Sequence, residues 1–203
     1  MIRIYIGTRS KNSRPYIVPR YVLCESSRYF EKALSSTFVE GQTGTLHFPE
    51  DNEAGWRVLL YFIIRKQVVE FVELTKGETN AHSWALAHAY ILADKYEIPA
   101  CQNAIVRAII EHLRYSVLSL AQKTKLLSVL PAGSHLQRII LEELVDGRSL
   151  EHYEWEQFEP LFQYEGVCTG LLRAAEHRWD GPDCPPFGVD ASEEALKGYL
   201  VNE

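Results

Sequence analysis

The chain has 203 residues, of which 46% are hydrophobic and 24% are charged, and its formal net charge is −6. This composition is typical of a globular protein and not of a disordered chain. No apolar run reaches the roughly 18 residues that a membrane helix needs, and the basic N-terminus has too short an apolar stretch for a signal peptide. We therefore expect an intracellular protein, in the cytoplasm or the nucleus, with no membrane segment.

The cysteines and the basic residues exclude two further classes. The four cysteines lie far apart and form no C-x-x-C pair, which favours free thiols in a reducing compartment over a disulfide framework. Lys and Arg concentrate near the N-terminus but form no long cluster, and the chain as a whole is acidic. We do not expect nucleic acid as a partner.

The first quarter of the chain predicts a small sheet with short helices. Apolar residues alternate with Arg3 and Tyr5, which is typical of a half-buried strand. Pro19 ends the second strand because proline has no N–H to donate, and Gly41 and Gly44 are expected to bracket a turn. The expected elements are strands over 2–6, 16–18 and 45–48, a polar hairpin loop over 8–14, a helical turn over 21–24, and a helix capped by Ser26 or Ser27 that runs to about Leu34.

The middle of the chain predicts three helices. Asp51 or Asn52 caps the first, whose apolar residues recur at the spacing of one buried face, and Pro99 sits at the first turn of the third, where helices tolerate proline. The buried face of the first helix is expected to contain Trp56, Leu59, Leu60, Ile63 and Ile64. The remaining elements are a strand over 68–74, a loop over 75–77, and helices over 81–96 and from 99 to about 112.

The second half of the chain reads as mainly helical. Ser134 caps one of the predicted helices, and a segment rich in proline and glycine, 180–190, predicts irregular structure. The expected helical segments cover 117–130, 135–144, 155–162 and 167–178.

This order of elements resembles the BTB/POZ domain, and three segments carry the resemblance. They are V-P-R-Y-V-L-C-E-S-S-R-Y-F at Val18 to Phe30, F-x-E-G at Phe38 to Gly41, and L-A-D-K-Y-x-I-P at Leu92 to Pro99. The resemblance implies an α+β fold over 1–115, in which a sheet of at least three strands packs with a helical cluster.

Two further stretches are similar to the fungal type of BTB protein. E-G-Q-T-G precedes the third strand and P-E-D-x-E-A follows it, while L-P-A-G-S-H-L-Q-R-I-I at Leu130 to Ile140 is similar to a segment of the helical C-terminal region of those proteins. This implies an all-helical extension over 116–179, followed by an irregular tail over 180–203 that can end in a short helix.

The chain departs from the family pattern in three places. Val18-Pro19-Arg20 stands where the family commonly has Val-His-Lys/Arg, and Ile64-Arg65-Lys66 stands where Tyr-Thr-Gly is common. The chain also begins directly in the first strand, whereas metazoan members have an upstream helix and strand that build a strand-swapped dimer. The sequence therefore does not favour that mode of dimer formation.

No catalytic, cofactor or metal site is predicted. The chain lacks G-x-S-x-G, the phosphate-binding G-x-x-x-x-G-K-[ST] and the dinucleotide-binding G-x-G-x-x-G. His152, Cys168, His177 and Cys184 lie in one part of the chain but lack the tight spacing of zinc ligands. An enzyme or metal-dependent protein hidden in the C-terminal helices is the weakest alternative.

The resemblance implies a non-enzymatic protein–protein interaction module, with a homodimer as one form and a cullin scaffold as another partner. A cullin-based ubiquitin ligase adaptor is the alternative function, and in this family it uses the A3 and A5 helices. The candidate self-association patch contains Tyr5, Arg20, Tyr21, Leu23, Cys24 and Tyr29. Leu23 and Cys24 can equally fill the core, because apolar residues of a helix occur both in protein cores and in interfaces.

Overall fold

The computed structural model describes residues 1–7, 14–68, 76–145, 154–179 and 196–202. These residues form helices and one small mixed sheet, which confirms the expected α+β class. The chain divides into two compact units, one made of 1–69 with 88–104 and the other of 70–87 with 105–202. We call them the N-terminal and the C-terminal unit. The predicted domain boundary after residue 115 stays a prediction.

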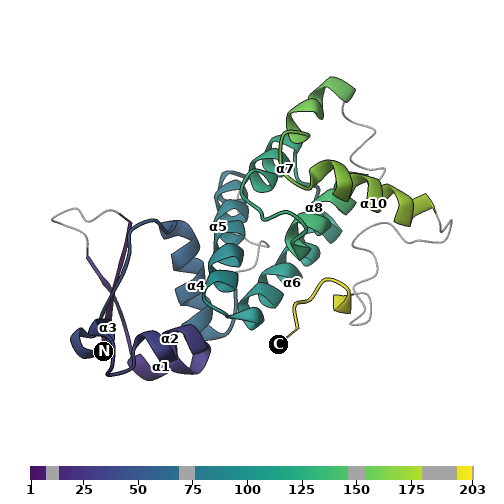
Figure 1. Ribbon diagram of the computed structural model, residues 1–203. Coiled ribbons are helices and arrows are strands. Elements are labelled where there is room, and N and C mark those ends of the chain that lie inside the picture. The colour runs from purple at the N-terminus through teal and green to yellow at the C-terminus, as the bar shows by residue number, and fades with distance from the viewer. Residues whose placement is uncertain (8–13, 69–75, 146–153, 180–195, 203) are drawn as a thin grey trace. The chain divides into compact units, whose positions relative to one another are not determined.

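The N-terminal unit combines a three-stranded sheet with short helices (Figure 1). Its elements are β1 (Ile2–Ile6), β2 (Tyr16–Val18), α1 (Arg20–Ser26), α2 (Arg28–Ala33), α3 (Val39–Thr43), β3 (Thr45–Phe48) and α4 (Glu53–Arg65). The strand order is β2-β1-β3, with β1 antiparallel to β2 and parallel to β3. The three expected strands are confirmed. Most of the predicted hairpin loop and of the strand over 68–74 lies outside the described residues.

The alternation of apolar and polar residues in β1 buries one side of the strand, as predicted. Ile2 and Ile4 are buried while Arg3 between them is exposed. Ile2 lies opposite Val18 and Ile4 opposite Leu46, so the apolar residues of all three strands share the core face.

Two caps place the helices that follow. Ser27, rather than Ser26, is the N-cap of α2, and its Oγ accepts the N–H of Phe30 at 3.3 Å. Asn52, rather than Asp51, caps α4, and its Oδ1 accepts the N–H of Gly55 at 3.0 Å. The sequence left these two pairs open, and the structure resolves them.

The core of the N-terminal unit is an aromatic cluster around Tyr96. Trp56 and Phe48 stack with ring centroids 4.8 Å apart, and the Tyr96 ring lies 5.2 Å from Phe48 and 5.3 Å from Trp56. Phe30 packs 5.3 Å from the same tyrosine. Such ring pairs contribute about 0.5–1.5 kcal/mol each beyond the area that they bury. The cluster therefore joins α2, β3 and α4 to the residue that follows α5.

Asp51 satisfies the polar groups at the edge of this cluster. Its carboxylate accepts the indole N–H of Trp56 at 2.8 Å and the hydroxyl of Tyr96, and it forms an ion pair with Lys95 at 2.7 Å. Burial acts to raise the pKa of Asp51, but the hydrogen bonds from Lys95, Tyr96 and Trp56 outweigh it, so the pKa lies below its usual value. Burial and the Asp51 contact raise the pKa of Tyr96, which keeps its hydroxyl protonated as a donor.

Three expectations in this unit and at its border are wrong. Gly41 lies inside helix α3 instead of at a turn. A Cβ at this position would come within 1.9 Å of the Ser35 carbonyl oxygen, so glycine serves a close approach of the backbone here. Ile64 is 55% exposed while Phe62 and Ile63 are buried, so the buried side of α4 includes Phe62 and ends at Ile63. The loop expected over 75–77 is already helical at Lys76.

The C-terminal unit is helical in its described part. The helices are α5 (Lys76–Lys95) and α6 (Pro99–Tyr115), which contribute to both units, followed by α7 (Leu120–Leu127), α8 (His135–Val145), the short 3-10 helices η1 (Trp155–Gln157) and η2 (Glu159–Leu161), and α10 (Val167–Trp179). Pro99 starts α6 and Ser134 caps α8 as predicted. Most of the predicted tail over 180–203 lies outside the described residues.

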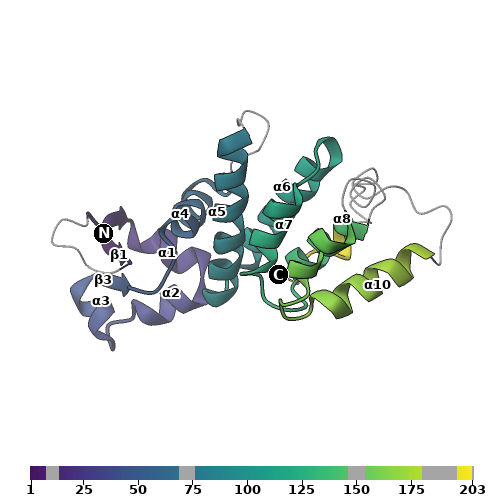
Figure 2. The same cartoon turned by 90° about the horizontal axis from the view of Figure 1, so that it is seen from above.

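Glycine allows α10 to lie alongside α8 (Figure 2). A Cβ at Gly170 would come within 2.4 Å of the Leu141 side chain. Nearby, the buried amide of Gln137 donates to the Glu165 carbonyl at 2.9 Å and accepts the Gly133 N–H at 2.7 Å. These contacts fix the loops before α8 and α10.

A buried ion pair links α7 and α8. Lys123 is fully buried, and its Nζ lies 2.6 Å from Oε2 of Glu143, which is also buried. The charges stabilise each other, but each costs several kcal/mol to remove from water. The loss of one charge is therefore expected to change the stability of the protein more than the intact pair contributes to it.

Asp51→Asn should lower the stability of the protein by about 1–3 kcal/mol at neutral pH, because a charged acceptor of buried donors is lost. Since folding lowers the pKa of Asp51 from its usual 3.8, its stabilisation is complete above that value and is lost as the pH falls through the lower folded pKa. Chemical denaturation from pH 7 to pH 3 should show a weaker acid dependence in the variant. Glu50→Gln, which removes an exposed carboxylate next to Asp51 in the sequence, is the control and should change stability little. An unchanged acid dependence in Asp51→Asn would contradict this role.

Lys123→Met and Glu143→Leu should each destabilise the protein by about 3–5 kcal/mol, because each removes one member of the buried ion pair and leaves the other charge buried. The double variant Lys123→Met/Glu143→Leu should recover most of this loss, since no charge then remains buried. Urea denaturation of the three variants forms the cycle. A double variant as unstable as the sum of its single changes would show that the two side chains act independently.

Candidate protein-interaction surfaces

Three of the six predicted interface residues line one open depression on α1. Met1, Pro19, Arg20, Tyr21 and Cys24 surround about 510 Å³ of space. Met1 and Tyr21 are 75% and 65% exposed. Exposed apolar groups that gather at one place indicate a binding surface more strongly than the same groups scattered singly.

The start of α1 positions the polar part of this depression. Pro19 precedes the helix in an extended conformation and so sets the direction of α1 as it leaves β2. The guanidinium of Arg20 donates to the carbonyl of Leu34, which holds its side chain against the end of α2. Cys24 carries a free, half-buried thiol. The depression therefore has a fixed cationic side and an apolar side.

The other three predicted residues lie elsewhere. Leu23 is fully buried in the core. Tyr5 lies on the outer face of the sheet, where its ring stacks on His47 with centroids 4.9 Å apart. Tyr29 packs 4.9 Å from Tyr96 and lines a different groove. The prediction thus combined residues that the fold separates.

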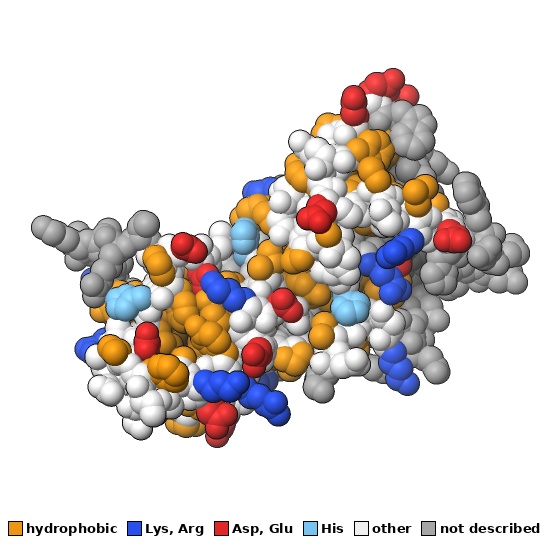
Figure 3. Space-filling view, in the orientation of Figure 1, with side chains coloured by type: hydrophobic (Ala, Val, Ile, Leu, Met, Phe, Trp, Pro, Cys, Tyr) orange, Lys and Arg blue, Asp and Glu red, His pale blue; other side chains and the backbone are white. Residues whose placement is uncertain are grey.

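The larger groove lies between α2, α3 and β3 and encloses about 810 Å³. Hydrophobic side chains gather in a hollow over this part of the N-terminal unit (Figure 3). The groove is lined by Tyr29, Lys32, Ala33, Phe38, Val39, Glu40, Thr43, Thr45, Leu46, His47, Phe48 and Glu97.

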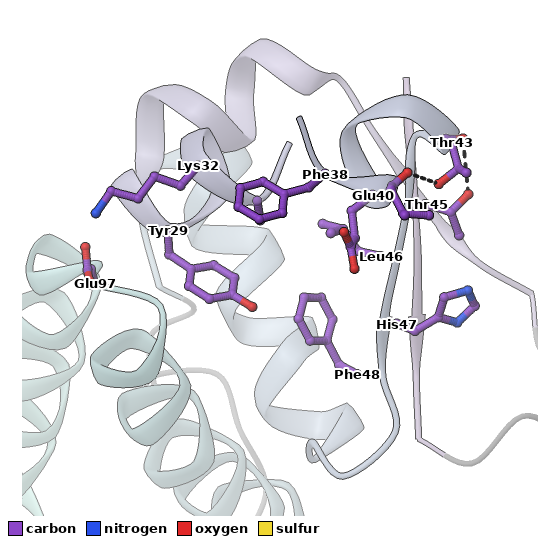
Figure 4. Close-up of a pocket in the computed structure, with 12 residues that line it drawn as sticks. Tyr29, Lys32, Phe38, Glu40, Thr43, Thr45, Leu46, His47, Phe48 and Glu97 are labelled. Carbon is purple, nitrogen blue, oxygen red and sulfur yellow. Dashed lines mark hydrogen bonds between the residues drawn. The ribbon is translucent and has the colours of Figure 1, made fainter. Parts of the chain in front are cut away.

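The groove has an apolar floor and charged groups around it. Tyr29, Glu40 and Phe48 point toward one another across it (Figure 4). Phe48 also stacks on Trp56 of the aromatic cluster, so the floor is anchored in the core. Lys32 lies at the end opposite Thr45 (Figure 4).

Sequence reasoning missed this groove. Phe38 and Val39 form its α3 wall and are 53% and 68% exposed. The available signal was a pair of bulky apolar residues beside a polar, glycine-containing segment, outside every predicted helix or strand. That pattern alone did not show whether the pair was buried.

One cysteine and one histidine in the described part of the chain have shifted pKa values. Burial raises the pKa of the Cys101 thiol to about 12, so it is a poor nucleophile at neutral pH. Burial, with the charge of His82, lowers the pKa of His112. Within the described ranges, no three His, Cys, Asp or Glu side chains are close enough to hold a metal ion. Cys168 is exposed, whereas the side chains of the other three residues in the weak metal hypothesis lie outside the described part.

Among the described helices, none is both long and apolar enough to cross a membrane. A scan against models of known protein families and a search of curated proteins each find no match. The functional argument therefore depends on the geometry and on the residues themselves.

Proposed function

We propose that this chain is a protein–protein interaction module of the BTB/POZ type that self-associates through the α1 depression. Support for the BTB/POZ part comes from the element order: a strand, its antiparallel return, the short helices α1, α2 and α3, a third strand, a helix and a helical pair. The segments that resemble the family form α1 with α2, α3 and the junction of α5 with α6. The fungal-type helical extension is supported by α7, α8 and α10.

The exposed apolar lining of the α1 depression supports self-association most directly. Tyr21 is 65% exposed, although an aromatic side chain can bury about 150–250 Å². The side chain of Arg20 beside it is already held by the Leu34 carbonyl, so binding costs little additional side-chain conformational entropy. An aromatic and an arginine at the centre of a patch are the residue types that dominate binding energy in interfaces.

Tyr21→Lys should weaken self-association at least tenfold, because the substitution places a second cation beside Arg20 in both copies. Multi-angle light scattering across micromolar concentrations should give twice the 23.3 kDa chain mass for the wild type and a monomer for the variant. Tyr61→Lys changes an exposed tyrosine of α4 and should stay dimeric. A wild type that is monomeric throughout, or a Tyr21→Lys variant that is as dimeric as the wild type, would refute self-association through α1.

A cullin scaffold adaptor is the second candidate, favoured by the exposed face of α4. Tyr61 and Ile64 lie three residues apart on one face of this helix and are 41% and 55% exposed. By the resemblance, α4 corresponds to the A3 helix that contributes to cullin contacts. This pair is apolar surface that a partner would cover.

Ile64→Lys should reduce capture of the full chain by immobilised cullin N-terminal domains at least tenfold, because a charge would enter an apolar contact. Tyr21→Lys should be captured as well as the wild type, since it alters only the α1 depression. Surface plasmon resonance measures both. The adaptor hypothesis fails if no cullin captures the wild type, or if Ile64→Lys is captured equally well.

A further inference from the structure

Among the described residues, no strand lies beside the outer edge of β3. In the sheet order β2-β1-β3, β3 is the last strand, and it pairs only with β1 among the described residues. The carbonyls of Gly44 and Phe48 accept hydrogen bonds from the Arg3 and Gly7 amides, both at 2.9 Å. Successive residues of a strand direct their backbone groups to opposite edges, so those of Thr45 and His47 point away from β1.

The sequence of β3 itself lacks two of the usual protections of an edge strand, lysine and proline. Natural edge strands are commonly protected by lysine, by proline or by a covering element. β3 reads Thr-Leu-His-Phe and contains neither residue. Within the described part of the chain, the outward backbone groups of Thr45 and His47 have no backbone partner. These groups are available to another strand.

The large groove runs along this edge. All four residues of β3 line it, although alternate residues of a strand face opposite sides of a sheet. Contact with both sets of side chains places the groove beside the strand rather than above one face. Its opposite wall comes from Tyr29 of α2 and from Phe38 and Val39 at the start of α3. A strand added to β3 would therefore lie in the groove, between the backbone of β3 and this apolar wall.

One charge in the groove limits what such a strand can carry. The carboxylate of Glu40 points into the space above Phe48 (Figure 4), and none of the ion pairs in the described structure includes it. A lysine or arginine in the occupant would pair with this carboxylate in partly apolar surroundings, where such pairs are stronger than in open water. An acidic residue at the same position would be repelled.

We propose that the groove binds an extended segment of a partner protein, which adds as a strand to the open edge of β3. Alternate side chains of the segment enter the groove, one a lysine or arginine that pairs with Glu40 and the next an apolar side chain that packs on Phe48 and Tyr29. Backbone hydrogen bonds to Thr45 and His47 provide affinity, and the groove provides specificity. This binding goes beyond the proposed self-association and is separate from it, since the two surfaces share no lining residue.

The probe is a displayed library of random linear peptides selected on the full chain, followed by fluorescence polarisation of an enriched peptide. Enriched sequences should alternate apolar residues and carry a lysine or arginine at an alternate position. Glu40→Lys should weaken binding at least tenfold, and replacing the basic peptide residue by glutamate should restore it. Glu50→Lys, an exposed carboxylate outside the groove, is the matched control and should bind like the wild type.

Backbone changes test strand addition itself. His47→Pro removes an outward N–H and spares the hydrogen bonds to β1, because edge strands tolerate proline at such positions; it should weaken binding at least tenfold. Peptides that are N-methylated at every second amide test the same point with the wild-type protein. Methylation of the amides that face β3 should abolish binding, whereas methylation of the amides that face away from β3 should leave it intact. The proposal is overturned if no peptide is enriched, if Glu40→Lys binds like the wild type, or if N-methylation has no alternating effect. Tyr21→Lys should retain peptide binding, which separates this proposal from self-association.

Discussion

Tyr96 makes three contacts on which the N-terminal unit depends. Its hydroxyl donates to the Asp51 carboxylate, its carbonyl accepts the Ser27 hydroxyl at 2.5 Å, and its ring packs among Phe30, Phe48 and Trp56. Ser27 is also the cap of α2, and Asp51 lies between β3 and α4. One residue therefore fixes the start of α2, the end of β3 and the entry to α4. Because these groups are buried or partly buried, a missing partner costs more than the bond contributes.

The contacts of Tyr96 explain why β3, a strand of only four residues, has a fixed position and register. Phe48 anchors one end of β3 in the aromatic cluster, and the parallel ladder with β1 holds the inner edge. The outer edge can then stay open without loss of register, because the buried Leu46 and Phe48 specify which face is inward. The same anchoring gives the groove a rigid floor, which reduces the cost of binding an extended segment.

Local signals in the sequence predicted most of the secondary structure. The alternation at β1 and the cap at Ser134 depend on neighbouring residues alone, so the sequence displays them. For α2 and α4 the sequence limits the cap to two adjacent residues, and the structure selects Ser27 and Asn52. The candidate site was only partly predictable. Arg20, Tyr21 and Cys24 meet on α1 as expected, but whether Leu23 is buried depends on packing from distant segments. The groove was not predictable, since the exposure of Phe38 and Val39 depends on where α2, α3 and β3 lie in space.

Residue-resolved hydrogen exchange across β3 tests most directly the claim that one edge of this strand is fixed and the other open. The account predicts slow exchange for the amides of Leu46 and Phe48, which face β1, and exchange at least a hundredfold faster for those of Thr45 and His47. Equal protection of all four amides would contradict it, because the outer edge would then be paired or covered.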